Sequence, residues 1–92
     1  MPSWKFFNNH GLVLLLIAQK GDVTARQLAQ ILGITERSIH RIIKDLQEGK
    51  YLQVQKSGRS NSYRINRRAT IRAKGLGDIS VGEYLSLFEN RD

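Results

Sequence analysis

The pattern of apolar and polar residues predicts a helix near the start of the chain, over about residues 9–19. Its interior, LVLLLIA, is apolar on every side, and Gly21 follows it. A helix without a polar face must be covered all round, either by the rest of the fold or by a partner. The apolar run is shorter than the roughly 20 residues that span a bilayer, so no membrane partner is expected.

Two further helices follow, separated by a very short link. The first starts at Thr24 with a T-x-x-Q capping-box pattern and ends before Gly33, a residue suited to the left-handed conformation that closes a helix. The second covers residues 35–48 and is followed by Gly49. A link of two residues between two angled helices predicts a helix-turn-helix.

Beyond this pair the apolar period changes from helical to alternating, which predicts a β-hairpin over residues 51–66. Three helices followed by a hairpin predict a mainly α fold with a small β-hairpin wing, a winged helix-turn-helix, in a domain of residues 1–66. Residues 67–79 are interpreted as a basic, irregular linker. Its cations are either phosphate contacts or part of a loose basic tail: Arg67, Arg68, Arg72 and Lys74. Residues 80–92 are predicted to form a last helix, which Ser80 opens through an S-x-x-E capping box.

Positive charge is concentrated in the middle of the chain. The net charge is +7, and eleven of the fifteen Lys and Arg residues lie between Ile34 and Lys74, with three of the eight acidic residues. Such an excess favours an anionic partner, most often nucleic acid. The chain has no cysteine, which excludes disulfides, thiol catalysis and zinc–thiolate sites and fits a cytoplasmic protein.

The predicted helix over residues 35–48 divides into two faces when it is drawn at 100° per residue. One face is apolar and consists of Ile39, Ile42, Ile43 and Leu46. The opposite face is cationic or carries imidazole and consists of Arg37, His40, Arg41 and Lys44. A helix of this kind fits the DNA major groove, where Arg pairs bidentately with guanine and Lys binds phosphate.

The expected DNA contacts come from this recognition helix and from the hairpin. The start of a recognition helix meets the bases, and a narrow Gly-Arg hairpin tip can enter a minor groove or follow the phosphates. The predicted contact residues are Thr35, Arg37, Ser38, His40, Arg41, Lys44, Lys56, Arg59, Asn61 and Arg64. The alternatives are an ordinary solvated helix face and a hairpin that is basic only for solubility.

Several segments resemble short bacterial winged-helix regulators of the MarR-like and ArsR-like kind. They are the start SWKFFNNHGLVLLLIA, the helix-turn-helix LAQILGITERSIHRIIKDLQEGKYL, the wing GRSNSYRI and the closing VGEYLSLF. The resemblance implies transcription regulation by a dimer bound to double-stranded DNA. The chain departs from the group at His40, where glutamine is frequent, and in the segment RRATIRAKGLGDI, which lacks a proline-rich stretch.

Other functions fit the sequence less well. The sequence has no glycine-rich nucleotide loop, metal-ligand spacing or nucleophile motif, so neither an enzyme nor a cofactor or metal site is expected. His10 is expected to form a hydrogen bond at the start of the first helix. A winged-helix module for protein binding would need an apolar or acidic third helix, whereas duplex RNA stays open because its shape alone can be recognised. No effector can be identified.

The apolar first helix also favours a homodimer. The fold covers one side of it, and apolar side chains from both ends of the chain could cover the other side in a two-fold pair. The expected interface consists of Trp4, Phe6, Phe7, Tyr84, Leu85 and Phe88. In the alternative, the N-terminal arm and the last helix fold back over the first helix of the same chain.

Overall fold

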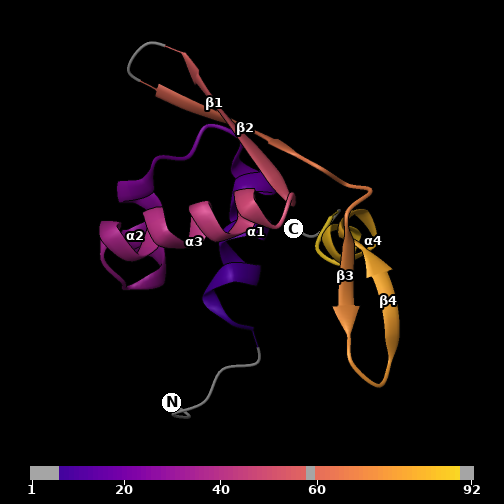
Figure 1. Ribbon diagram of the computed structural model, residues 1–92. Helices are drawn as coiled ribbons and strands as arrows, with labels where there is room; N and C mark the ends of the chain where they lie inside the picture. Colours follow the sequence, from indigo (N-terminus) through magenta and orange to yellow (C-terminus); the bar gives the residue numbers. More distant parts are fainter. Residues whose placement is uncertain (1–6, 58–59, 90–92) are drawn as a thin grey trace.

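The computed structural model describes residues 7–57 and 60–89, which form helices and two β-hairpins (Figure 1). The elements in chain order are α1 (Asn9–Lys20), α2 (Ala25–Leu32), α3 (Glu36–Glu48), β1 (Leu52–Ser57), β2 (Ser60–Ile65), β3 (Thr70–Ala73), β4 (Gly77–Ser80) and α4 (Val81–Ser86). The predicted winged helix-turn-helix is confirmed: three helices are followed by an antiparallel wing, β1–β2.

Local signals set the helix boundaries. The side chain of Asn8 caps α1 by accepting a hydrogen bond from the backbone N–H of Gly11 at 2.9 Å. Thr24 and Gln27 form the predicted capping box at the start of α2, with reciprocal hydrogen bonds of 3.0 and 2.8 Å. Gly33 ends α2 in the left-handed conformation, with φ of 69°. The helix-turn-helix therefore follows from side chains next to each other in sequence.

A single hydrophobic core joins all four helices. The most deeply buried large side chains are those of Val13, Leu28, Ile39, Val81 and Leu85. Each such side chain stabilises the fold by about 1.5–3 kcal/mol relative to an exposed position. Because two of these residues belong to α4, the last helix is part of the same core as α1, α2 and α3.

Helix α1 is covered in part by α4 of its own chain. The hydroxyl of Tyr84 donates a hydrogen bond to the carbonyl of Gly11 at 3.1 Å. Further along α1, the side-chain amide of Gln19 donates to the carbonyl of Phe88 at 3.3 Å. Within one chain, the last helix therefore folds back over the first, as in the intramolecular alternative.

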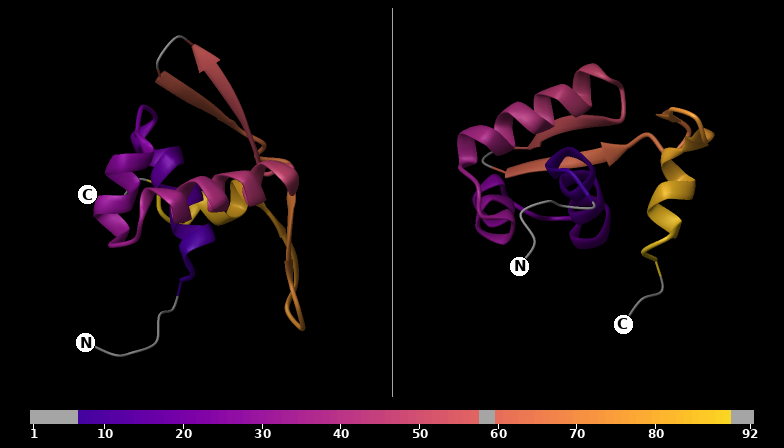
Figure 2. Two further views of the ribbon diagram at one scale, coloured as in Figure 1. Left: turned by 60° about the vertical axis from the view of Figure 1, so that its left-hand side comes forward. Right: turned by 90° about the horizontal axis from the view of Figure 1, so that it is seen from below.

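The wing places one face on the core. Its register runs from Leu52 opposite Ile65 to Ser57 opposite Ser60. Leu52 is buried, and Val54, Tyr63 and Ile65 are half-buried against the core. The wing and the second hairpin extend in opposite directions from the C-terminal end of α3 (Figures 1 and 2).

The prediction of an irregular linker over residues 67–79 is wrong. Strands β3 and β4 form a second antiparallel hairpin there, with Thr70 opposite Ser80 and Ala73 opposite Gly77. The alternating signal is only four residues long in each strand, and Arg72 and Lys74 gave it a basic composition that hid it. Positive φ angles in the turn region, 83° at Gly75 and 88° at Gly77, allow the chain to reverse.

Candidate nucleic-acid interface

A threonine cap holds the start of α3. The hydroxyl oxygen of Thr35 accepts a hydrogen bond from the backbone N–H of Ser38 at 3.0 Å, and the hydroxyl donates to Ser38 Oγ at 3.0 Å. The two hydroxyl residues predicted to contact DNA therefore also fix the first turn of the helix. They lie at the end of α3 that meets base edges in helix-turn-helix proteins.

Beyond the cap, α3 separates its apolar and basic side chains as its periodicity predicts. The apolar residues are buried, and they are Ile39, Ile42, Ile43 and Leu46. The basic and imidazole residues are exposed, and they are Arg37, His40, Arg41 and Lys44. Among the residues that the structure describes, none of these four forms an ion pair. Their charged and polar groups are therefore available to an external anion.

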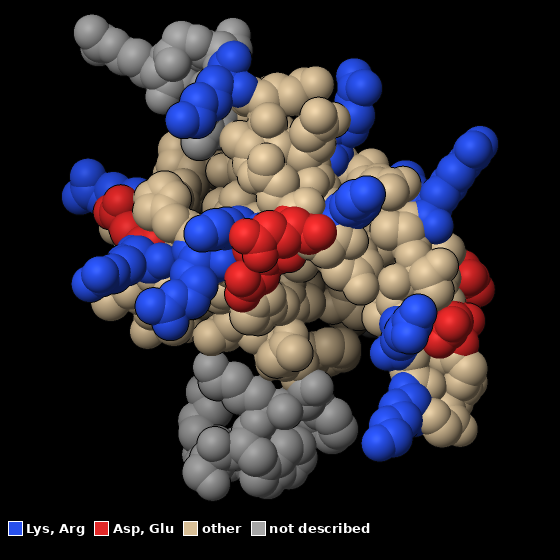
Figure 3. Space-filling model, in the orientation of Figure 1, with Lys and Arg blue, Asp and Glu red and all other residues tan. Residues whose placement is uncertain are grey.

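The C-terminal half of α3 exposes the acidic side chains of Asp45 and Glu48, and Glu36 in the first turn is exposed as well. Asp45 Oδ2 lies 2.8 Å from His10 Nε2, so this carboxylate is tied to α1. His10 thus forms a contact between two helices rather than a local bond at the start of α1. Glu48 is also exposed, about 16 Å along the helix axis from Arg37. Figure 3 shows acidic atoms near the middle of this face with basic atoms around them, so side chains of both charges lie on this face.

Two of the wing residues that were predicted to contact DNA have exposed side chains. Arg64 is exposed and lies opposite Gln53 in the β1–β2 ladder. Lys56 is exposed and lies opposite Asn61. Arg59, at the predicted tip, is outside the described residues. The wing therefore adds two exposed cations to those of α3.

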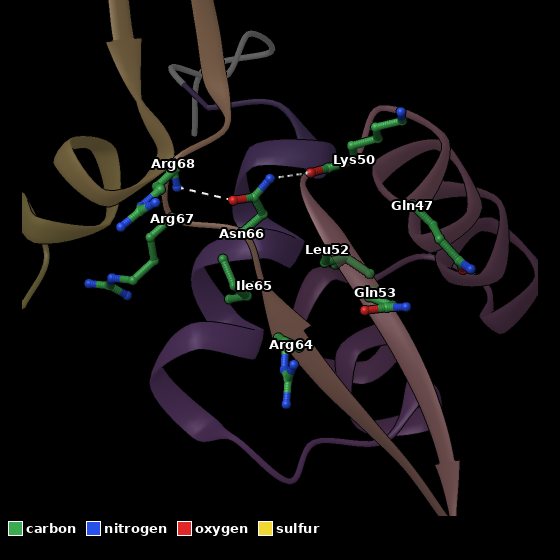
Figure 4. A pocket seen from close by; sticks show the side chains of 9 residues that line it. All are labelled: Gln47, Lys50, Leu52, Gln53, Arg64, Ile65, Asn66, Arg67 and Arg68. Carbon is green, nitrogen blue, oxygen red and sulfur yellow. Dashed lines mark hydrogen bonds between the residues drawn. The ribbon is translucent and has the colours of Figure 1, made fainter.

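A hollow of about 680 Å³ lies where the end of α3 meets the base of the wing (Figure 4). Its basic lining residues are Lys50, Arg64, Arg67 and Arg68. Of these, Arg64 is predicted to contact DNA, whereas the sequence leaves open whether Arg67 and Arg68 are phosphate contacts or part of a loose basic tail. Lys50 is distant from these arginines in the sequence and meets them because β2 returns antiparallel to β1 and brings the following segment beside the end of α3.

The predicted dimer-interface residues in the described part of the chain cluster around α4. The side chain of Leu85 is 2% exposed and belongs to the core of its own chain. Phe88 packs edge-to-face on Phe7, with ring centroids 5.6 Å apart, and on Tyr84 at 6.3 Å. Burial raises the pKa of Tyr84, and Phe7 remains 44% exposed. The other two predicted interface residues lie outside the described part: Trp4 and Phe6.

The described part of the chain has neither a metal-binding cluster nor a membrane-spanning helix. Within residues 7–57 and 60–89, no three His, Asp or Glu side chains gather into a group that could hold a metal ion. In the same part of the chain, no helix has the length and apolarity needed to cross a membrane.

The fold is shared with solved structures of two bacterial proteins. A mutant of ZitR from Lactococcus lactis superposes with a TM-score of 0.63 and 16% sequence identity, over 96% of this chain and 54% of that one. A mutant of MepR from a multidrug-resistant S. aureus clinical isolate gives a TM-score of 0.61 and 17% identity, over 89% of this chain and 56% of that one. The chain therefore spans little more than half the length of these neighbours, and the likeness at these identities concerns the fold alone.

Comparison of the sequence with known families identifies the family of this chain. None of the curated sequences compared with the chain matches it significantly. A sequence model of the MarR family matches residues 8–60, a span that runs from the cap of α1 to the start of β2 and includes the whole helix-turn-helix. The match covers more than half of the chain, and the chain therefore belongs to the MarR family.

Proposed function

We propose that this chain is a transcription regulator that binds double-stranded DNA, with α3 in the major groove and the wing on the adjacent backbone or minor groove. The observation that carries the proposal is the exposed basic face of α3, where Arg37, Arg41 and Lys44 form no ion pair among the described residues. The opposite face of the same helix is fixed in the core. A rigid helix presents its side chains at defined positions, as base recognition requires.

The residues of α3 take different roles in this proposal. Arg37, in the first turn, contacts a base edge, and Arg41, one turn later, contacts the same groove. Lys44 contacts phosphate as a point charge. The capping residues Thr35 and Ser38 contribute hydroxyl groups near the entrance of the groove.

Replacing Arg37 by Ala tests the role of α3. Sites are first selected from random duplexes with the wild-type protein, and the affinity of both proteins for the selected site is then measured. We expect the variant to lose about 1–3 kcal/mol and to relax its preference at one base position. Lys74→Ala is the matched control, because it removes an exposed positive charge in the turn of the second hairpin.

Two outcomes would contradict the proposal. Equal binding of the selected site by the Arg37→Ala variant and the wild type would show that α3 does not read bases. If the wild type bound an RNA duplex of the same sequence as tightly as the DNA duplex, the protein would recognise duplex shape and phosphates. The second candidate function, binding of duplex RNA, would then be favoured.

We also propose that the protein acts as a homodimer. Phe7 is 44% exposed beside the half-buried Phe88, so an aromatic surface remains at the start of α1 after α4 has covered part of that helix. Two-fold pairing through this surface would present two recognition helices, and the selected site would be a palindrome with half-sites about 34 Å apart. Sedimentation equilibrium at micromolar concentration should give twice the chain mass, and a mass near 10.5 kDa would contradict the dimer.

A further inference from the structure

The hollow at the base of the wing is lined by several basic side chains and by no acidic one. One wall comes from the end of α3, with Lys50, and the opposite wall from the segment after β2, with Arg67 and Arg68. Arg64 lines the hollow from β2, and in Figure 4 it lies below both of these groups. The other lining residues are polar amides or apolar, and none of them is acidic.

The positive charge of the hollow is only partly compensated. Arg67 pairs with Glu89, which is not one of the residues lining the hollow. Among the described residues, Lys50, Arg64 and Arg68 form no ion pair, and all three side chains are exposed. Their long side chains can therefore turn toward an anion in the hollow without breaking an existing contact.

A single side chain connects the two walls. The Nδ2 group of Asn66 donates a hydrogen bond to the carbonyl of Lys50 at 3.1 Å, and its Oδ1 accepts one from the backbone N–H of Arg68 at 3.2 Å (Figure 4). The backbone N–H of Asn66 also donates to the carbonyl of Tyr51 at 2.9 Å. The backbone positions of the two cationic residues are thus fixed relative to each other before any ligand binds, which lowers the cost of binding.

The backbone of Lys50 is left-handed, a conformation that is uncommon for residues other than glycine. Its φ is 65°, and it is the only non-glycine residue with a positive φ in the described part of the chain. Gly49, which was expected to close α3 as Gly33 closes α2, is instead right-handed with φ of −76°. A Cβ atom at Gly49 would lie 2.7 Å from the ring of Tyr51, so this glycine is needed for close packing. A lysine therefore stands where glycine would be less strained, which suggests a use for its side chain.

We propose that this hollow binds one phosphate of the DNA backbone, held by Lys50 and Arg68 from its two walls and by Arg64 from β2. The proposal rests on the proposed function, in which α3 occupies the major groove and the wing reaches the next groove. The sugar–phosphate strand that separates the two grooves then passes the junction of α3 and the wing, where the hollow lies. A phosphodiester supplies the anionic oxygens that these cations lack.

The test combines two protein variants with single neutral phosphates in the duplex. We expect Lys50→Gly and Arg68→Gln each to weaken binding of the selected duplex roughly tenfold and to lower the log–log salt slope by about one. Replacing one particular phosphate by an uncharged methylphosphonate should weaken the wild type equally and the Arg68→Gln variant hardly at all. The matched control, Arg72→Gln, should still lose affinity at that phosphate.

The Lys50→Gly variant also separates binding from folding. Glycine relieves the left-handed backbone at this position, so the melting temperature should be at or above that of the wild type while DNA affinity falls. A fall in both quantities would show that Lys50 serves the fold, and would count against its role as a phosphate ligand.

Other results would overturn the proposal in distinguishable ways. If Arg68→Gln bound DNA as tightly as the wild type while Arg37→Ala lost site preference, the hollow would be no DNA contact and the proposed function would stand. Inorganic phosphate, titrated at constant ionic strength, tests a free anion as the source. Perturbation of the Lys50 and Arg68 amide signals by this phosphate, with no effect of Arg68→Gln on DNA binding, would assign the hollow to a free anion and overturn the backbone assignment.

Discussion

The two hairpins share an antiparallel two-stranded topology but rest on the core to very different extents. In the wing, Leu52 is 3% exposed, and Tyr63 and Ile65 are half-buried against the core. In the second hairpin, Ile71 is half-buried against the core, whereas Leu76 in the turn is 90% exposed. The wing is therefore a layer on the core, and the second hairpin projects away from it (Figure 1).

The second hairpin is anchored at its base instead of along one face. The backbone N–H of Val81 donates to the carbonyl of Ala69 at 2.8 Å, and that of Gly82 donates to the carbonyl of Arg67 at 2.9 Å. The hydroxyl of Tyr51 donates to the carbonyl of Thr70 at 3.3 Å. A two-stranded hairpin is marginal alone in water, so these contacts and α4 support it. The second hairpin therefore connects the wing to α4 through contacts at its base.

Equivalent truncations in the two hairpins should have unequal effects on stability. Leu52→Ala removes a buried side chain from the base of the wing and should lower the free energy of unfolding by about 2–4 kcal/mol. Ile71→Ala removes a half-buried side chain and should cost about 1 kcal/mol. Urea titrations of both variants and the wild type, followed by circular dichroism, give the two values. Equal losses would contradict the difference in anchoring.

Sequence patterns predicted the features that depend on neighbouring residues. The cap of α3 at Thr35, the two capping boxes and the division of α3 into two faces all follow from side chains one or two helical turns apart. The wing was also predictable, because its strands alternate over six residues and lie close together in the sequence. The second hairpin was missed, since a pattern of four residues cannot be distinguished from an irregular basic segment.

The contacts that complete the candidate site depend on the folded chain. His10 and Asp45 meet across 35 residues, and Asn66 reaches the carbonyl of Lys50 across 16. The left-handed conformation at Lys50 could not be predicted either, because Gly49 is the residue that local rules favour there. Gly49 instead continues the right-handed end of α3, and the ring of Tyr51 packs where a Cβ atom at Gly49 would lie.

A second prediction compares one arginine in each hairpin and concerns DNA binding. Its expected effect is smaller than the loss of stability in Leu52→Ala. Arg64 in β2 and Arg72 in β3 are both exposed, and replacement of either by Gln lowers the net charge equally. If the wing lies on the DNA backbone, Arg64→Gln should weaken binding to all duplex sequences by about 1 kcal/mol and lower the log–log salt slope by about one. Arg72→Gln should change the slope little, because its hairpin extends away from the wing (Figure 1).

Fluorescence anisotropy titrations at several salt concentrations measure both quantities for both variants. Arg64 belongs to a hairpin that contacts the core and lies beside the hollow, so an anion bound there should meet this guanidinium without a change in the backbone. Arg72 lies opposite Asp78 in the β3–β4 ladder, on the hairpin that extends away from the wing. A uniform loss with Arg64→Gln and none with Arg72→Gln would restrict the DNA contact to the wing. Equal losses would show that the protein is attracted to DNA by its overall positive charge, and the wing would then have no special role in binding.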